Sequence, residues 1–128
     1  MITKIKKILQ KKNKSKIISL TAYSKNIAKI LDNYCDIILV GDSMANVLYA
    51  QKNTHRISLK KIIEHSASVR QGVKRSLLVV DMPKGTYEDV RTAEKNARLV
   101  IKSTSCDAIK LESNKKNYKI IKALVEKN

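Results

Sequence analysis

The sequence has no tryptophan, no phenylalanine, one proline, three glycines and two cysteines among its 128 residues. Such low proline and glycine content argues against disordered linkers, collagen-like repeats and low-complexity segments. Cys35 and Cys106 lack a CxxC partner, so we expect buried reduced thiols rather than a zinc site or a disulfide framework. No apolar run approaches the roughly 18 residues of a membrane helix or suits a secretory signal, and we expect a cytoplasmic protein without a membrane partner.

Acidic residues are also scarce, since 11 Asp and Glu stand against 27 Lys and Arg, which gives a net charge of +16. A strongly basic protein often binds nucleic acid. Here only five of the basic residues are arginine, the type that best reads bases, and the lysines are spread along the whole chain. We therefore expect no specific nucleic-acid partner. A basic domain that binds polyanions without specificity stays as the last of three functional interpretations, after the two given below.

What the sequence does contain is a repeated alternation of strand and helix patterns. Isoleucines and leucine at helical spacing predict an amphipathic helix at about 2–13. Apolar runs predict strands at 17–23, 36–40, 77–81 and 108–112. Helices are expected at 24–31, at 58–72 and from near Thr86 to Lys102, with an irregular stretch at 44–57. Ser113 and Asn114 lead into a last amphipathic segment with apolar residues at 120–125.

Four strand-helix units in series predict a parallel sheet covered on both faces, in a single domain of residues 1–128. The fold class is α/β. The pattern alone fits an open doubly wound sheet and part of a closed barrel equally well.

Three of the expected strands end at or near an acid: Asp81 and Glu112 are the last residues of theirs, and Asp42 lies two residues beyond 36–40. The carboxyl ends of parallel strands lie at one edge, and alternation puts Lys110 on the same side as Glu112. Carboxylates that converge repel one another unless a cation lies among them, and oxygen ligands suit Mg²⁺. The alternative is that these acids only cap helices or are solvated at strand ends.

Tyr23, His55 and His65 also lie near the expected strand ends or helices. Tyr23 either faces the strand-end rim or packs in the core. His55 and His65 are expected to be ordinary surface or packing residues. Neither GxGxxG nor a phosphate-binding GxxxxGK[ST] motif is present.

Five segments, in order along essentially the whole chain, resemble the ketopantoate hydroxymethyltransferase family. They are SLTAYS from Ser19, LVGDSMANVLYA from Leu39, HSASVRQG from His65, LLVVDMPKGTYE from Leu77 and DAIKLE from Asp107. The resemblance implies a TIM (β/α)8 barrel, of which this chain is about half. It also implies transfer of a one-carbon unit from 5,10-methylenetetrahydrofolate to 3-methyl-2-oxobutanoate, which gives 2-dehydropantoate for pantothenate biosynthesis.

The resemblance assigns roles to five residues. Asp42 and Asp81 are implied as Mg²⁺ ligands, with Glu112 as the third acid of the metal site, acting directly or through water. Ser43 and Lys110 are implied to hold the oxoacid carboxylate. Magnesium chelated by the keto oxygen and the carboxylate would stabilise the enolate that forms when the neighbouring proton leaves.

The sequence departs from the family pattern beside these residues. Met44-Ala45-Asn46 stands where the family has a glycine-rich turn, and Ser113-Asn114 stands where it has a Gly-Gly pair. Ser24 replaces an aspartate and Lys84 an apolar residue. We expect the turns beside the metal to differ in geometry.

A TIM barrel needs about 250 residues, and this sequence supplies four of its eight strands. The family's glutamate base is expected beyond Asn128, so no catalytic residue is assigned here. Half a barrel has two open sheet edges, and we expect a homo-oligomer or a complementing second half to cover them. The alternative function is an inactive remnant or assembly partner of the enzyme.

Overall fold

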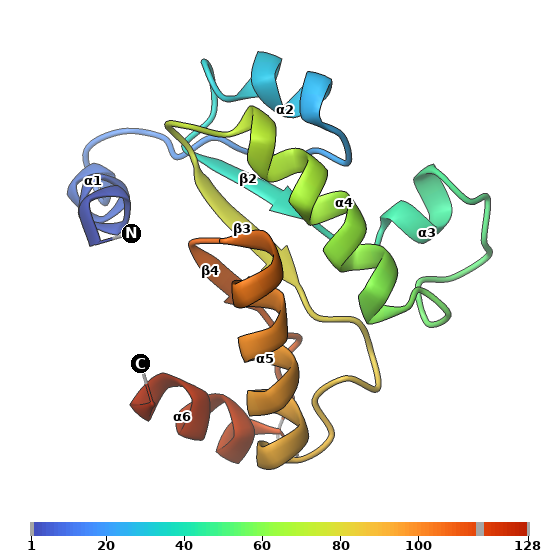
Figure 1. Ribbon diagram of the computed structural model, residues 1–128. Helices are drawn as coiled ribbons and strands as arrows, with labels where there is room; N and C mark the ends of the chain where they lie inside the picture. The colour runs from blue at the N-terminus through green and yellow to red at the C-terminus, as the bar shows by residue number, and fades with distance from the viewer. Residues whose placement is uncertain (1, 115–116, 128) are drawn as a thin grey trace.

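The computed structural model describes residues 2–114 and 117–127, so the ends of the expected 1–128 domain, Met1 and Asn128, lie outside it. Strands and helices alternate along the chain (Figure 1). The elements are α1 (Ile2–Lys11), β1 (Ser19–Thr21), α2 (Lys25–Leu31), β2 (Ile37–Val40), α3 (Met44–Val47), α4 (Leu59–Gly72), β3 (Leu77–Asp81), α5 (Val90–Thr104), β4 (Ala108–Lys110) and α6 (Tyr118–Glu126). Among the described helices, none is long and apolar enough to span a membrane.

The four strands form one parallel sheet in the order β1-β2-β3-β4. A doubly wound sheet reverses its strand order at a switch point, and the described strands show no reversal. Strand order that follows the chain is the arrangement of a (β/α)8 barrel wall. The structure therefore confirms the α/β class and is consistent with about half of a barrel.

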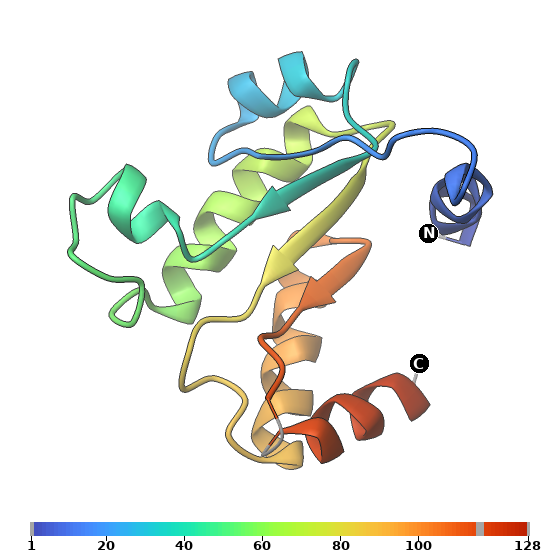
Figure 2. The ribbon, with the colours of Figure 1, turned by 180° about the vertical axis from the view of Figure 1, so that it is seen from behind.

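Helices cover one face of this sheet. Ile38, Val40, Leu78 and Val80 are fully buried in the core with residues of α2, α4 and α5. Figure 2 shows the other face in front, with α4 and α5 behind the strands. The expectation that both faces are covered is not met among the described residues, since in a barrel the inner face packs against other strands of the wall.

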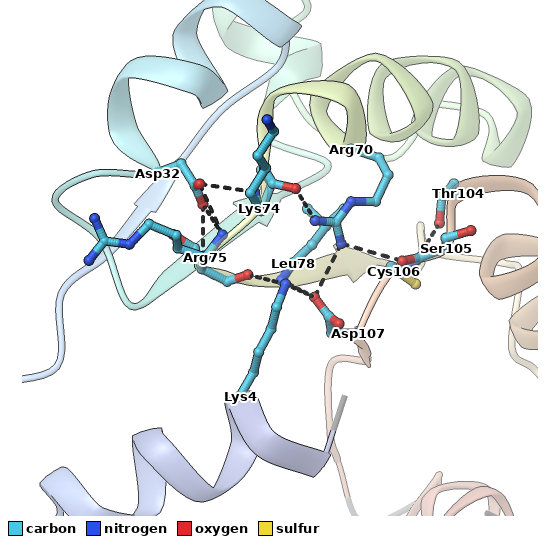
Figure 3. Close-up of polar contacts among 12 residues, drawn as sticks. Lys4, Asp32, Arg70, Lys74, Arg75, Leu78, Thr104, Ser105, Cys106 and Asp107 are labelled. Atoms are coloured by element: carbon cyan, nitrogen blue, oxygen red, sulfur yellow. Dashed lines mark hydrogen bonds and ion pairs between the residues drawn. The ribbon is translucent and has the colours of Figure 1, made fainter.

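The amino-terminal ends of the strands are held by a buried carboxylate (Figure 3). Asp32, which follows α2, accepts hydrogen bonds from the backbone N–H groups of Lys74, Arg75 and Ser76 at 2.8–3.1 Å. These bonds fix the turn that leads from α4 into β3, so β3 starts at a defined height in the sheet.

Asp107 ties the first helix to the same end of the sheet (Figure 3). Its Oδ2 accepts from the backbone N–H of Leu78 at 2.9 Å and pairs with Lys4 at 3.2 Å and Arg70 at 3.3 Å. Lys4 also donates to the carbonyl oxygen of Ser76 at 2.8 Å. The α1 helix, within the range 2–13 where a helix is expected, therefore lies at the amino-terminal end of the strands.

Two local predictions need correction. The helix expected from near Thr86 begins at Val90, because Asp89 accepts from the N–H of Thr92 at 2.9 Å and caps α5 there. Thr86 instead donates its hydroxyl to the carbonyl oxygen of Pro83 at 2.6 Å, which closes a turn ahead of the helix. The stretch expected to be irregular after residue 43 contains the one-turn helix α3.

Candidate active site

The candidate site lies where β2, β3 and β4 end. Asp81, the last residue of β3, is paired in register with Lys110 of β4, so both side chains project from the same face of the sheet. The Nζ atom of Lys110 donates to both carboxylate oxygens of Asp81 at 2.9 Å. The strand pairing itself thus builds a charged pair on the face that the helices leave open.

The two members of this pair are buried to different extents. Asp81 is 3% exposed, and its burial raises the pKa of the carboxyl above the ordinary value although the bonds and charge of Lys110 oppose the change. Burial lowers the pKa of Lys110, but the hydrogen bonds and charge of Asp81 outweigh burial and leave it raised. A buried anion with a raised pKa gains from a further positive charge beside it.

Asp42 lies next to this pair, two residues beyond β2. Its charge raises the pKa of Asp81, whereas its backbone hydrogen bond to Asp81 lowers it. At the preceding Gly41, a Cβ would lie 3.3 Å from Ser43 Oγ, which is tight, and 3.9 Å from Asp81 Oδ2, which is ordinary van der Waals contact. Of the expected constellation of Asp42, Asp81, Glu112 and Lys110, the structure thus brings Asp42, Asp81 and Lys110 together. A close group of all three acids is not found among the described residues.

Ser43 lies at the N-terminus of α3, where its side chain makes no capping bond. Its Oγ instead lies 2.7 Å from the hydroxyl oxygen of Tyr23, which follows β1. Tyr23 is partly buried against the hydrophobic core while its hydroxyl reaches Ser43, so the structure combines the two positions considered for it. All four strands thus contribute to this end of the sheet.

Glu112 lies two residues beyond β4 and is exposed. It acts electrostatically on Lys110 and on Tyr87, whose pKa burial raises. Tyr87 also carries a hydrogen bond to the backbone of Glu112 and interacts with Asp81 and Lys110. Tyr87 falls at the start of the helix expected from near Thr86, and the sequence pattern gave it no role in the site. Its position in the segment after β3 was a signal for the rim.

The oxygen ligands of the site fit Mg²⁺ as a pair of carboxylates and not as a group of three. Within residues 2–114 and 117–127, no three His, Cys, Asp or Glu side chains gather closely enough to hold a metal ion. Asp42 and Asp81 provide a pair of neighbouring carboxylates, and Mg²⁺ in proteins commonly takes one or two carboxylates plus water and substrate oxygens. Each carboxylate oxygen has two lone pairs, so the bonds of Lys110 leave acceptor capacity on Asp81.

Comparison with known proteins assigns the family. The ketopantoate hydroxymethyltransferase family matches residues 2–128. Three similar proteins are named 3-methyl-2-oxobutanoate hydroxymethyltransferase. The protein of Pelagibacter ubique is 56% identical over 98% of this chain and 49% of its own length. The protein of Helicobacter pylori (strain HPAG1) is 44% identical over 89% of this chain and 42% of its own length. The protein of Agrobacterium fabrum is 40% identical over 92% of this chain and 43% of its own length.

This chain thus spans about half the length of the curated relatives that it matches. The match includes the strand ends that carry Asp42, Asp81 and Lys110. By this match, the chain belongs to the ketopantoate hydroxymethyltransferase family.

Proposed function

We propose that this chain carries the metal and oxoacid site of a hydroxymethyltransferase that acts on 3-methyl-2-oxobutanoate. The one-carbon unit would come from 5,10-methylenetetrahydrofolate and the product would be 2-dehydropantoate. The observation that supports this most is the pair formed by Asp81 and Lys110 on the open face of the sheet, with Asp42 beside it. It combines carboxylates for a divalent ion with an ammonium group for an organic acid.

Asp42 and Asp81 would hold Mg²⁺, and Glu112 would reach it through water. The bound ion would supply Lewis-acid polarisation of the keto group. The buried carboxylate of Asp81 is suited to this role because its ionised form is poorly solvated, and a cation beside it offsets that penalty.

Ser43 and Lys110 would bind the carboxylate of the oxoacid. An ammonium group has three donors, and Lys110 uses donors on Asp81 while its side chain is 41% exposed. It can therefore contact Asp81 and a substrate carboxylate together. The hydroxyl of Ser43, held by Tyr23, provides a second donor on the β2 side.

The relatives are about twice as long as this chain, so we propose that the complete reaction uses further barrel strands. No general base is assigned among the residues described. The remaining wall would come from a complementing half or, less directly, from a homo-oligomer. A cytoplasmic setting is supported by the buried free thiols of Cys35 and Cys106, because reducing compartments keep thiols unpaired.

Urea unfolding with Mg²⁺ and 3-methyl-2-oxobutanoate tests the proposal. A ligand that binds only the folded state at 100 times its Kd stabilises the fold by about 2.7 kcal/mol. We expect the two ligands together to raise the unfolding midpoint, and D42N or D81N to abolish that rise. The control E126Q removes an exposed carboxylate on α6 that pairs with Lys122, and it should keep the full response.

Two outcomes support the rival functions. If the ligands together leave the midpoint of the wild-type chain unchanged, the chain is a remnant or assembly partner without a working site. If the chain instead binds DNA of any sequence with a steep salt dependence, and D42N with D81N preserves or strengthens that binding, the polyanion interpretation is favoured.

A further inference from the structure

His65 on α4 is bonded through both ring nitrogens. Its Nδ1 lies 2.7 Å from the backbone carbonyl oxygen of Tyr23, and its Nε2 lies 2.9 Å from the hydroxyl oxygen of Tyr49. A carbonyl oxygen only accepts, so Nδ1 carries the hydrogen. In the neutral ring, Nε2 is then an acceptor, and the hydroxyl of Tyr49 donates to it.

The His65 ring therefore links two segments of the chain. One carries Tyr23 and precedes Asp42 and Ser43, and the other carries Tyr49 and follows them. Tyr23 lies two residues beyond the end of β1, and Tyr49 lies between α3 and α4. The rings of Tyr49 and His65 meet edge to face, with centroids 6.1 Å apart and planes at 82°. The Tyr49 ring has a second contact, because the ammonium of Lys61 lies over it at 5.4 Å from the ring centre. This cation–π contact favours one orientation of the Tyr49 ring.

Tyr23 connects this arrangement to the candidate site. Pairing with β2 extends to Ala22, whose N–H donates to the carbonyl oxygen of Leu39 at 3.1 Å. At the next residue, His65 fixes the carbonyl of Tyr23, and the hydroxyl of the same tyrosine meets Ser43 Oγ at 2.7 Å. Because the Ser43 hydroxyl bonds to that of Tyr23, the orientation of Tyr23 decides where the Ser43 hydroxyl points. Ser43 adjoins Asp42, so this hydroxyl belongs to the candidate site.

We propose that His65, with hydrogen on Nδ1, is a positioning residue for the oxoacid site: it fixes Tyr23, and Tyr23 orients the hydroxyl of Ser43. The sequence prediction of an ordinary packing histidine would give it no such role. The identity of the bound oxoacid rests on the proposed function, whereas the link from His65 to Ser43 rests on the contacts alone.

Nuclear magnetic resonance of the ¹⁵N- and ¹³C-labelled 128-residue chain tests the link without substrate. We expect the spectrum of the His65 ring to show hydrogen on Nδ1 and none on Nε2. H65N places an amide N–H near the position of Nδ1, whereas H65Q places its amide near Nε2. The Tyr23 ring and Ser43 Cβ signals should stay near their wild-type positions in H65N and move in H65Q.

The exposed His55 offers a matched control, and H55N should move neither signal. Hydrogen on Nε2 in the wild-type chain would overturn the proposal, even if H65Q failed to fold. So would unchanged Tyr23 and Ser43 signals in a folded H65Q variant.

Binding of 3-methyl-2-oxobutanoate to the chain in saturating Mg²⁺ supplies the functional readout. We expect H65Q to weaken the oxoacid Kd about tenfold, H65N to stay within about twofold, and Mg²⁺ affinity without oxoacid to be unchanged in both. Equal weakening by H65N and H65Q would overturn a role that acts through Tyr23. If the wild-type chain binds no oxoacid, the proposed function fails, and the resonance experiment still decides the position of Ser43.

Discussion

At the scale of single residues, Asp32 shows how one carboxylate supports the fold. Burial alone would raise the pKa of Asp32, but the N–H groups of Ser76, Arg75 and Lys74 together keep it below the ordinary value. A lowered pKa in the folded state contributes stability above the unfolded-state value, and that contribution is lost as pH falls through the folded value.

We therefore expect D32N to lower the free energy of unfolding by about 2 kcal/mol at pH 6, because an amide N–H would face backbone donors. As pH falls below the ordinary aspartate value of 3.8, the unfolded chain binds the proton first, because the pKa of Asp32 is lowered in the folded state, and the difference should shrink. Urea unfolding at pH 6 and pH 3 measures this, with E126Q as the control for loss of a surface charge. A difference of equal size at both pH values would contradict the assignment.

Single residues also show what sequence could and could not reveal. The proximity of Asp42, Asp81 and Lys110 was predictable because strand alternation and parallel pairing dictate it. The same reasoning also placed Glu112 with these acids, and no close group of three acids is found among the described residues. The partners of Asp32 lie 42 to 44 positions further along the chain, and no local pattern encodes them. The contact between Tyr23 and Ser43 depends on side-chain rotamers, so sequence left two positions open for Tyr23.

At the scale of elements, Gly72 explains how closely α2 and α4 pack. Sequence predicted this glycine as the stop of the helix that began at Ser58, and α4 does end there. Its role is different from that of a left-handed C-cap, because it has no positive φ. A Cβ at Gly72 would lie 2.3 Å from the carbonyl oxygen of Lys25 and 2.8 Å from the backbone N of Lys29.

Backbone atoms of a helix cannot move aside as a flexible side chain does, so α2 would have to shift. We expect G72A to lower the free energy of unfolding by about 3 kcal/mol, at the upper end of overpacking effects. The exposed neighbour Gln71 gives the control, and Q71A should change stability by less than about 0.5 kcal/mol. Urea unfolding of both variants checks this, and equal stabilities would show that α2 yields easily.

Elements differ in how well sequence predicts their bounds. The strand β3 was predicted to its last residue because its apolar run is largely buried and lies between Ser76 and Asp81. The expected strand at 17–23 is shorter in the structure, where β1 is an exposed edge with pairing on one side only. The start of α5 was predicted about one turn early, because Thr86 closes a turn on the carbonyl oxygen of Pro83 and Asp89 caps the helix from the N–H of Thr92.

At the scale of the whole molecule, the order of the strands and the open sheet face together define what the chain is suited to do. The described sheet is one consecutive part of a barrel wall, and its carboxyl ends carry acids beside one ammonium group. The strand-helix pattern alone did not distinguish this from a doubly wound sheet, because both begin with the same units, and only the family resemblance favoured a barrel. The net charge of +16 does not prevent a local acidic site, since Asp42 and Asp81 are grouped where the strands end.

The most direct test of the account replaces Mg²⁺ with paramagnetic Mn²⁺ and follows the backbone amide signals of the chain. A single ion shared by the ends of β2 and β3 should broaden the signals of Asp42, Ser43 and Asp81 first, and excess Mg²⁺ should restore them. Asp32 and Asp107, at the opposite end of the sheet, should keep sharp signals. Broadening centred on Asp32 and Asp107, or spread evenly over all acidic residues, would contradict the account.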